Sequence, residues 1–239
     1  MEKKIFRKIL SFFCMCLIFT GTASAERKPD NYTETINSVA PYTVNGEENS
    51  ISRGDCVASV MKIVGVDKET EKMYNSVYFD APIFMDVTGH RSCINDGYII
   101  PAKYAKVAIG VQRYDVFGNP YSVILFEPHQ NVTIKEALAF ILRCLTDSST
   151  LSWDNTMEDA VKYGLITQDE LTDCEPDSEL TNGQFRIFLR RMLNSPRYLY
   201  WPTEYDNVYG SKTAKTDITG SMKYIDWFNQ VKHLVTDEA

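Results

Sequence analysis

Three segments of this chain share one helix-start pattern: a hydroxyl residue, an Asp, Glu or Gln three positions later, and an apolar helical run. They read ISRGDCVASVMKIV (51–64), VTIKEALAFILRCL (132–145) and LTNGQFRIFLRRML (180–193). In a capping box of this kind, the hydroxyl oxygen accepts a hydrogen bond from the backbone N–H three residues on. The side chain at that third position reaches back to the N–H of the cap. An apolar residue precedes each cap and can pack against the first turn. Three copies with one spacing predict three helices of the same kind.

The apolar residues behind each cap also agree in position. They fall at offsets of four, seven and eight from the first, which place them on one helix face. This inward set is Cys56, Val60, Ile63, Val64, Ala137, Ile141, Cys144, Leu145, Phe185, Leu189, Met192 and Leu193. We therefore expect the three helices to share one core.

The first 25 residues have the parts of a secretory signal peptide: four basic residues within 3–8, an apolar stretch over 9–19, and small residues at 23–25. The apolar stretch is too short for a membrane span. Bulky residues precede Cys14 and Cys16, where a lipoprotein signal needs small ones. We expect cleavage after Ala25 and export without a membrane span, with the polar stretch 26–50 as a linker.

The chain is acidic, with a formal net charge of −7, and the predicted signal segment holds four of its basic residues and one acidic one. The remainder is therefore more acidic still. Such a charge argues against nucleic acid as a partner and against docking on anionic lipid.

Four cysteines follow the signal segment: Cys56, Cys93, Cys144 and Cys174. Outside the cell they can pair as disulfides, but Cys56 and Cys144 fall on the inward helix face, where a free thiol serves as a small apolar group. Their spacing forms no metal motif. The sequence favours free cysteines over a disulfide framework without deciding between them.

The likeness extends upstream of the second and third caps. FEPHQNVT at 126–133 matches CEPDSELT at 174–181, and each proline fixes the backbone before its helix. A second type of helix lies in each interval, over 98–110 and 151–166, and Gly164 is placed to end the latter.

The order of these elements resembles the S-layer homology repeat of bacterial surface proteins. That pattern runs from FxDVxxxHWA through a helix with a glycine exit to FxPxxxITRAE and an apolar helix. The residues that carry the resemblance are Phe84, Asp86, Val87, His90, Tyr98, Ile99, Ala102, Val107, Gly110, Gly118, Phe126, Pro128, Val132, Thr133, Glu136 and Ala137, and in the later copy Trp153, Ala160, Gly164, Leu165, Ile166, Pro176, Leu180 and Thr181. The resemblance covers residues 51–194.

This resemblance implies a ligand. In the family, the Arg of TRAE and the Trp of HWA line grooves that hold an anionic, commonly pyruvylated, secondary cell-wall polymer. The Arg slot holds Arg53 in the first copy, and the Trp slot holds Arg91 in one HWA segment and Trp153 in the other. Lys135, one position after the Arg slot of the second copy, is a further candidate. An arginine fork suits a carboxylate, and an indole face suits a sugar ring.

The copies differ in this ligand chemistry. Where the family has Arg after the cap, only Arg53 remains, because the other two copies have Ile134 and Asn182. Arg53 also lies at a helix start, where free amides and the helix dipole favour an anion. The alternative interpretation makes Arg53 a solvated helix-start residue and Trp153 a core anchor.

The sequence offers little for catalysis. His90, His129 and His233 have no partner at a spacing typical of a metal site or a nucleophile and its base. We therefore expect no enzyme, no metal and no cofactor.

The segment 195–239 is rich in aromatic residues and predicts one more amphipathic helix. Met222, Ile225, Phe228, Val231 and Val235 form the stripe that packs on the bundle. Alternatively, the aromatic residues before it form an exposed contact for a sugar or a protein; these are Tyr198, Tyr200, Trp201 and Tyr205.

Together these patterns predict a mainly α protein: three helix-loop-helix repeats in a pseudo-threefold bundle over 51–194. The predicted function is noncovalent attachment of a secreted protein to cell-wall polysaccharide at the surface of a Gram-positive type of envelope. The alternative is an extracellular module that binds another surface protein and has lost its polysaccharide grooves.

Overall fold

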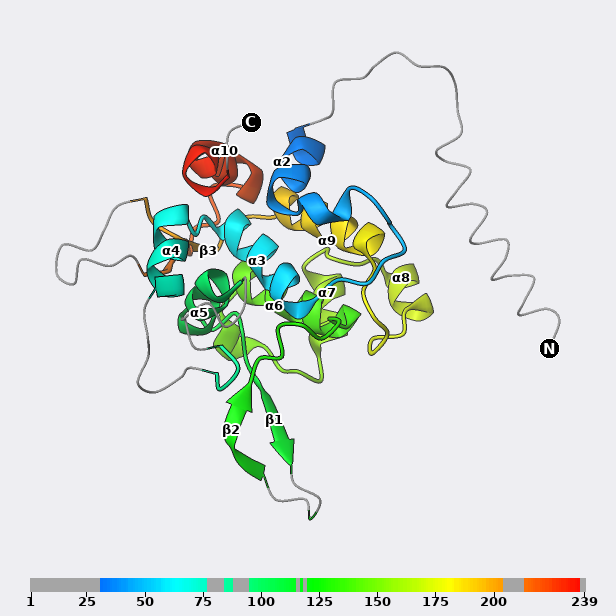
Figure 1. The fold of residues 1–239 in the computed structure, drawn as a ribbon. Helices are drawn as coiled ribbons and strands as arrows, with labels where there is room; N and C mark the ends of the chain where they lie inside the picture. The colour runs from blue at the N-terminus through cyan, green and yellow to red at the C-terminus, as the bar shows by residue number, and fades with distance from the viewer. Residues whose placement is uncertain are drawn as a thin grey trace. The chain divides into compact units, whose positions relative to one another are not determined.

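The computed structural model describes residues 31–76, 84–87, 95–114, 117, 120–203 and 213–236, and this part of the chain is mainly helical (Figure 1). The longer helices are α2 (Asn31–Val39), α3 (Arg53–Val64), α4 (Lys68–Ser76), α5 (Asp96–Tyr104), α6 (Ile134–Leu145), α7 (Thr156–Lys162), α8 (Gln168–Asp173), α9 (Asn182–Asn194) and α10 (Tyr224–Val235). Short 3-10 turns are η1 (Pro41–Thr43) and η2 (Ser148–Thr150). Within the described ranges, no helix is long and apolar enough to cross a bilayer. The predicted signal segment 1–25 lies outside the described residues.

Two short antiparallel ribbons complete the structure. β1 (Val111–Tyr114) pairs with β2 (Pro120–Leu125), and β3 (Leu199–Tyr200) pairs with β4 (Lys215–Thr216). The first ribbon projects from the helices between α5 and α6 in the chain (Figure 1).

The three predicted helices begin where the caps place them, as α3, α6 and α9. Thr133 and Thr181 form full capping boxes with Glu136 and Gln184. The Ser52 cap differs from the prediction: its oxygen accepts from the Asp55 N–H, but no return bond from Asp55 to the Ser52 amide forms. An Asp side chain is one methylene shorter than Glu, and this carboxylate accepts from the Ser52 hydroxyl at 2.7 Å instead.

All twelve residues of the predicted inward set are buried, which confirms the shared core. α3 packs against α6, and α6 packs against α9. Large apolar side chains from the intervening segments, including Phe84 and Phe126, join the same cluster.

Backbone hydrogen bonds join the three segments just before their helices into a closed ring. The Ile51 N–H donates to the Leu180 carbonyl at 3.2 Å, Leu180 donates to Val132 at 2.9 Å, and Val132 donates back to Ile51 at 2.9 Å. Each of these residues lies directly before a cap and is buried. The positions that the sequence pairs by pattern therefore contact one another in space.

The first two amides of each capped helix are also bonded in rotation. Each pair donates to the turn that precedes another capped helix, at 2.9–3.0 Å. The bonds run from Arg53 to Gln130, Gly54 to Pro128, Ile134 to Ser178, Lys135 to Pro176, Asn182 to Asn49 and Gly183 to Glu47. These amides have no partner inside their own helix, so the neighbouring turn satisfies them.

The helices between the capped ones end alike. Gly164 follows α7 in the left-handed conformation, at φ +72°, as its place in the sequence predicts. Lys106 takes the same position after α5, at φ +60°. In both, the next amide returns to an alanine carbonyl at 2.8 Å, from Val107 to Ala102 and from Leu165 to Ala160.

Within the stretch 26–50 that the sequence assigns to a linker, residues 31–39 form the helix α2. Ile36 and Val39 lie three positions apart on one face and are buried. α2 packs against α9 and α3. A short helix with so few apolar residues gives a weak sequence signal, and its burial comes from these two neighbours.

The C-terminal segment packs on the bundle. α10 contacts α3 and α9, and the predicted stripe of Ile225, Phe228, Val231 and Val235 is buried. Trp201 is buried as well, so the exposed-contact alternative is wrong for that residue. Tyr205 lies outside the described residues.

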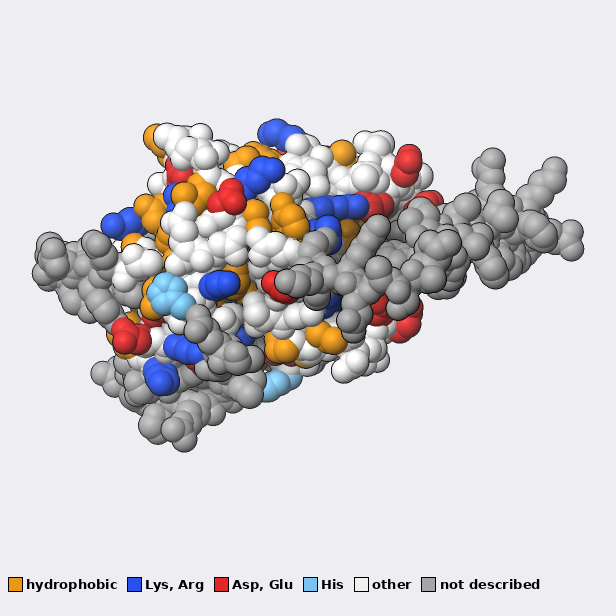
Figure 2. Space-filling view, turned by 90° about the horizontal axis from the view of Figure 1, so that it is seen from above, with side chains coloured by type: hydrophobic (Ala, Val, Ile, Leu, Met, Phe, Trp, Pro, Cys, Tyr) orange, Lys and Arg blue, Asp and Glu red, His pale blue; other side chains and the backbone are white. Residues whose placement is uncertain are grey.

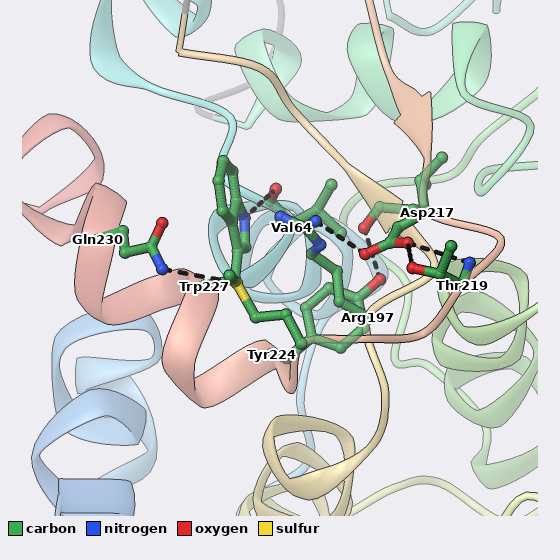
Figure 3. A network of polar contacts seen from close by, with 9 residues as sticks. Val64, Arg197, Asp217, Thr219, Tyr224, Trp227 and Gln230 are labelled. Atoms are coloured by element: carbon green, nitrogen blue, oxygen red, sulfur yellow. Dashed lines mark hydrogen bonds and ion pairs between the residues drawn. The ribbon is translucent and has the colours of Figure 1, made fainter.

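A network of polar contacts joins the C-terminal segment to the end of α3 (Figure 3). The Trp227 indole N–H donates to the Val64 carbonyl at 2.9 Å, and a Cβ on Gly65 would lie 3.0 Å from that indole nitrogen. Arg197 lies over the Trp227 ring and pairs with Asp217 at 2.9 Å. Hydrogen bonds from Thr219 and from Arg197 lower the pKa of Asp217 from 3.8 to about 2.

Candidate functional site

Arg53 is a buried residue in this fold. Only 3% of it is exposed, its Nε donates to the Phe126 carbonyl at 2.9 Å, and its guanidinium pairs with the Glu136 carboxylate. The guanidinium also lies over the rings of Phe126 and Phe140, at 5.1 and 5.7 Å from their centroids. Each of these contacts joins α3 to the second capped segment or to the residues just before it.

The helix start beside Arg53 offers no free amides for an anion. The Arg53 and Gly54 amides donate to the turn before α6, and the Asp55 amide donates to the Ser52 hydroxyl at 3.1 Å. Because Arg53 is buried, the alternative that made it a solvated helix-start residue is wrong. This position is buried in all three copies, since Ile134 and Asn182 are 4% exposed.

Lys135 and Trp153 lie together in the structure. The Lys135 ammonium lies 4.8 Å from the Trp153 ring centroid, and the arrangement has the geometry of a cation–π contact. Lys135 stands in the first turn of α6, whereas Trp153 lies just before α7. Trp153 is 48% exposed, so it is not a core anchor. We call these two residues the Lys135–Trp153 pair.

Arg91 lies outside the described residues. In the described part of that copy, Asn95 makes the backbone bond that corresponds to Trp153: the Tyr98 N–H donates to Asn95 at 2.9 Å, and the Thr156 N–H donates to Trp153 at 3.3 Å. The Asn95 amide donates to the Asp55 carboxylate at 3.0 Å. An asparagine at this place has no ring face for a sugar. The HWA pattern does not reveal this correspondence, because the two copies differ in length before the helix.

The Lys135–Trp153 pair can do two things chemically. An ammonium attracts a carboxylate, and an exposed indole packs against the apolar face of a sugar ring. Figure 2 shows one face of the molecule, where basic side chains are interspersed with acidic and apolar ones. The described residues of that face form no broad field of positive charge.

The described residues form neither a reactive thiol site nor a metal site. Among them, Cys56, Cys144 and Cys174 are free, and no group of three or more His, Cys, Asp or Glu side chains could hold a metal ion. Burial raises the pKa values of the Cys56 and Cys144 thiols, which disfavours the reactive thiolate. Cys93 and His90 lie outside the described residues.

A cavity lies near the C-terminal ends of α5 and α6, and no sequence pattern predicts it. Its lining residues come from α4, α5, the end of α6 and both strands of the second ribbon. Residues so far apart in the chain share no local spacing pattern, which is why the sequence gives no signal for it.

Comparison with known protein families and with curated proteins found no match to this chain.

Proposed function

We propose that this is a secreted protein that attaches noncovalently to cell-wall polysaccharide, through three repeats of the S-layer homology type around a pseudo-threefold axis. The Lys135–Trp153 pair is the contact. The observation that carries the proposal is the exposed indole of Trp153, in the Trp slot of the resemblance, beside the ammonium of Lys135, one position after the Arg slot.

The repeat architecture rests on the backbone bonds before the capped helices. Ile51, Val132 and Leu180 occupy one sequence position in the three segments, and each donates to another in rotation. The first two amides of each helix also donate in a closed cycle, which runs around the three segments in the opposite direction. A single type of contact used three times in a closed cycle is what rotation about a shared axis produces.

One groove, at the second capped helix, carries the proposed ligand chemistry. The first lacks it, because Arg53 is committed to Glu136 and because Asn95 stands where the second copy has Trp153. The ligand is an anionic polysaccharide, with the sugar on the indole and the carboxylate on the ammonium, such as a pyruvylated secondary polymer.

The burial of Arg53 also favours a second function. Because Arg53 is part of the core, it is not available to hold a polysaccharide. The alternative function is that of an extracellular module that binds another surface protein. Binding then depends on exposed residues outside the family slots, and wall polysaccharide has no part in it.

Retention on purified wall sacculi separates the two functions. We expect the wild-type protein to be retained, and both Trp153→Ala and Lys135→Gln to lose most of that retention. Lys162→Gln is the matched control, since Lys162 lies over another aromatic ring, that of Tyr163, at 5.2 Å. Thermal midpoints show that each variant is folded.

The opposite results are equally clear. If the wild-type protein is retained no better than an unrelated acidic protein, wall attachment is refuted and the protein-binding function is favoured. Retention that survives loss of both side chains would place the contact elsewhere on the repeats.

A further inference from the structure

The cavity near the ends of α5 and α6 has a volume of about 510 Å³. Neither Lys135 nor Trp153 lines it. Cavities of this size hold small ligands, and a few polar groups at fixed places then decide which ligand binds.

Tyrosine rings supply much of its apolar surface. Tyr74 from α4 and Tyr104 from α5 lie with ring centroids 6.1 Å apart, and Tyr198 lines the cavity from the segment before β3. Tyr104 is 57% exposed. Exposed tyrosine rings beside a cavity suit the apolar face of a sugar, since each ring offers a flat surface and a hydroxyl.

Positive charge exceeds negative charge among the described residues that line the cavity. The Arg143 Nη1 donates to the Val107 carbonyl at 3.0 Å, and a guanidinium carries five N–H donors. No other partner for this guanidinium occurs within the described ranges. Lys106 is exposed and lies on the same wall.

Asp147 is the one carboxylate among the described residues of the lining, and it is already engaged. Asp147 accepts from the Ser149 amide at 2.9 Å, and hydrogen bonds from Ser149 lower its pKa, with a smaller contribution from Lys106. Arg143 is partly buried, and its desolvation lowers its pKa, yet an arginine stays charged at neutral pH. An anionic group on a ligand would offset that desolvation.

We propose that this cavity binds an acidic carbohydrate of one or two rings, stacked on Tyr104, with its carboxylate held by Arg143 and Lys106. Asp147 and Ser148 lie within the same lining and supply partners for ring hydroxyls. The site goes beyond the proposed wall contact and does not depend on it.

Titration of the purified protein with D-glucuronate, D-glucose and acetate, by isothermal calorimetry and saturation-transfer NMR, tests the proposal. We expect saturable binding of glucuronate, about tenfold weaker binding of glucose, and no saturable binding of acetate, because ring and carboxylate both contribute. Tyr104→Ala should weaken glucuronate binding at least about fivefold.

Lys106→Gly removes the second cation and keeps the left-handed backbone that Gly164 adopts after α7. We expect it to weaken glucuronate binding and to leave glucose binding unchanged. Trp153→Ala is the matched aromatic control and should bind glucuronate like the wild type, while Tyr104→Ala should keep its retention on sacculi. The cavity proposal and the wall-contact proposal can therefore be refuted independently of each other.

Three results would overturn the proposal. They are the absence of saturable glucuronate binding, equal affinity for glucose and glucuronate, and full glucuronate affinity in a folded Tyr104→Ala variant.

Discussion

Replacement of Arg53 by Met tests whether this arginine serves folding or ligand binding. Arg53→Met removes the ion pair with Glu136, the bond to the Phe126 carbonyl and two cation–π contacts, while its unbranched side chain fills much of the same space. We expect the variant to fold, to be less stable, and to be retained on sacculi like the wild type.

The expected cost follows from what each lost contact leaves behind. A buried carbonyl without its donor costs about 1–3 kcal/mol, and cation–π contacts contribute about 1 kcal/mol. Breaking a buried ion pair costs about 3–5 kcal/mol when the remaining charge is fully buried. Since the Glu136 side chain is 23% exposed and water reaches it, the ion pair should contribute only about 1 kcal/mol. With about 1 kcal/mol each for the carbonyl and the cation–π contacts, we expect a total of about 3 kcal/mol.

A double-mutant cycle isolates the ion pair. Glu136→Gln should keep the cap, because Gln184 accepts from the Thr181 amide at 3.0 Å in the equivalent box. We expect it to cost about 1–2 kcal/mol, and Arg53→Met with Glu136→Gln to cost about 1–3 kcal/mol less than the sum of the two single variants. Lys135→Met, on a half-buried residue of the same first turn, is the control and should cost less than about 1 kcal/mol.

Equilibrium unfolding in guanidinium chloride, followed by far-UV circular dichroism, measures these differences as midpoint shifts at constant slope. A cost for Arg53→Met below about 1 kcal/mol would refute the assignment of this residue to the core. A variant with unchanged stability and lost wall retention would instead support the ligand role that the family resemblance implies.

Three further predictions concern packing, pH and thiol reactivity. Gly164→Ala should lower the free energy of unfolding by about 1 kcal/mol, because its site is open and only the left-handed backbone is strained; Gly65→Ala should cost at least about 2 kcal/mol, because its φ is +103° and the new Cβ meets the indole of α10. Equal costs in chemical denaturation would contradict this contact. The depressed pKa of Asp217, about 2 in the folded protein, means that its ionised form adds stability above a pH of about 3.8 that is lost as the pH falls toward 2. Asp217→Asn should therefore melt below the wild type at pH 6, and the difference should close through that window; a constant difference would be inconsistent with the ion pair. Finally, Cys56 and Cys144 should resist alkylation in the folded protein and react after unfolding, as peptide mass spectrometry would report, and rapid native labelling of either would contradict its burial.

The parts of the fold that the sequence predicts are those set by short-range chemistry. A cap and its partner are three residues apart, and the inward stripe repeats within each helix. The caps Thr133 and Thr181 and the apolar residues behind them can therefore be predicted without a structure. Gly164 is equally local, because a helix exit in the left-handed conformation needs a residue that tolerates it. The pattern was less reliable for Asp55, whose shorter side chain bonds the cap hydroxyl instead of the cap amide.

The sequence likewise predicted only part of the candidate site. The resemblance makes Trp153 a candidate ligand residue, with Lys135 one position after the Arg slot, and the fold brings the two to 4.8 Å. The resemblance also makes Arg53 a candidate, and the fold buries it. The two cations stand one position apart in the first turn: Arg53 begins its helix, at the position that is buried in all three copies, whereas Lys135 is the second residue of its helix.

The sequence alone therefore determined where the capped helices begin and which face each one buries, because those properties depend on neighbours within one or two turns. Only the tertiary structure decided the partners of the helix-start amides, the burial of Arg53, the placement of α2 and the cavity beside Tyr104. The bond from Arg53 to Phe126 spans 73 residues and that from Trp227 to Val64 spans 163. Contacts over such separations are fixed by how the helices pack. That arrangement makes Arg53 part of the core and leaves Lys135 half-buried beside an exposed indole.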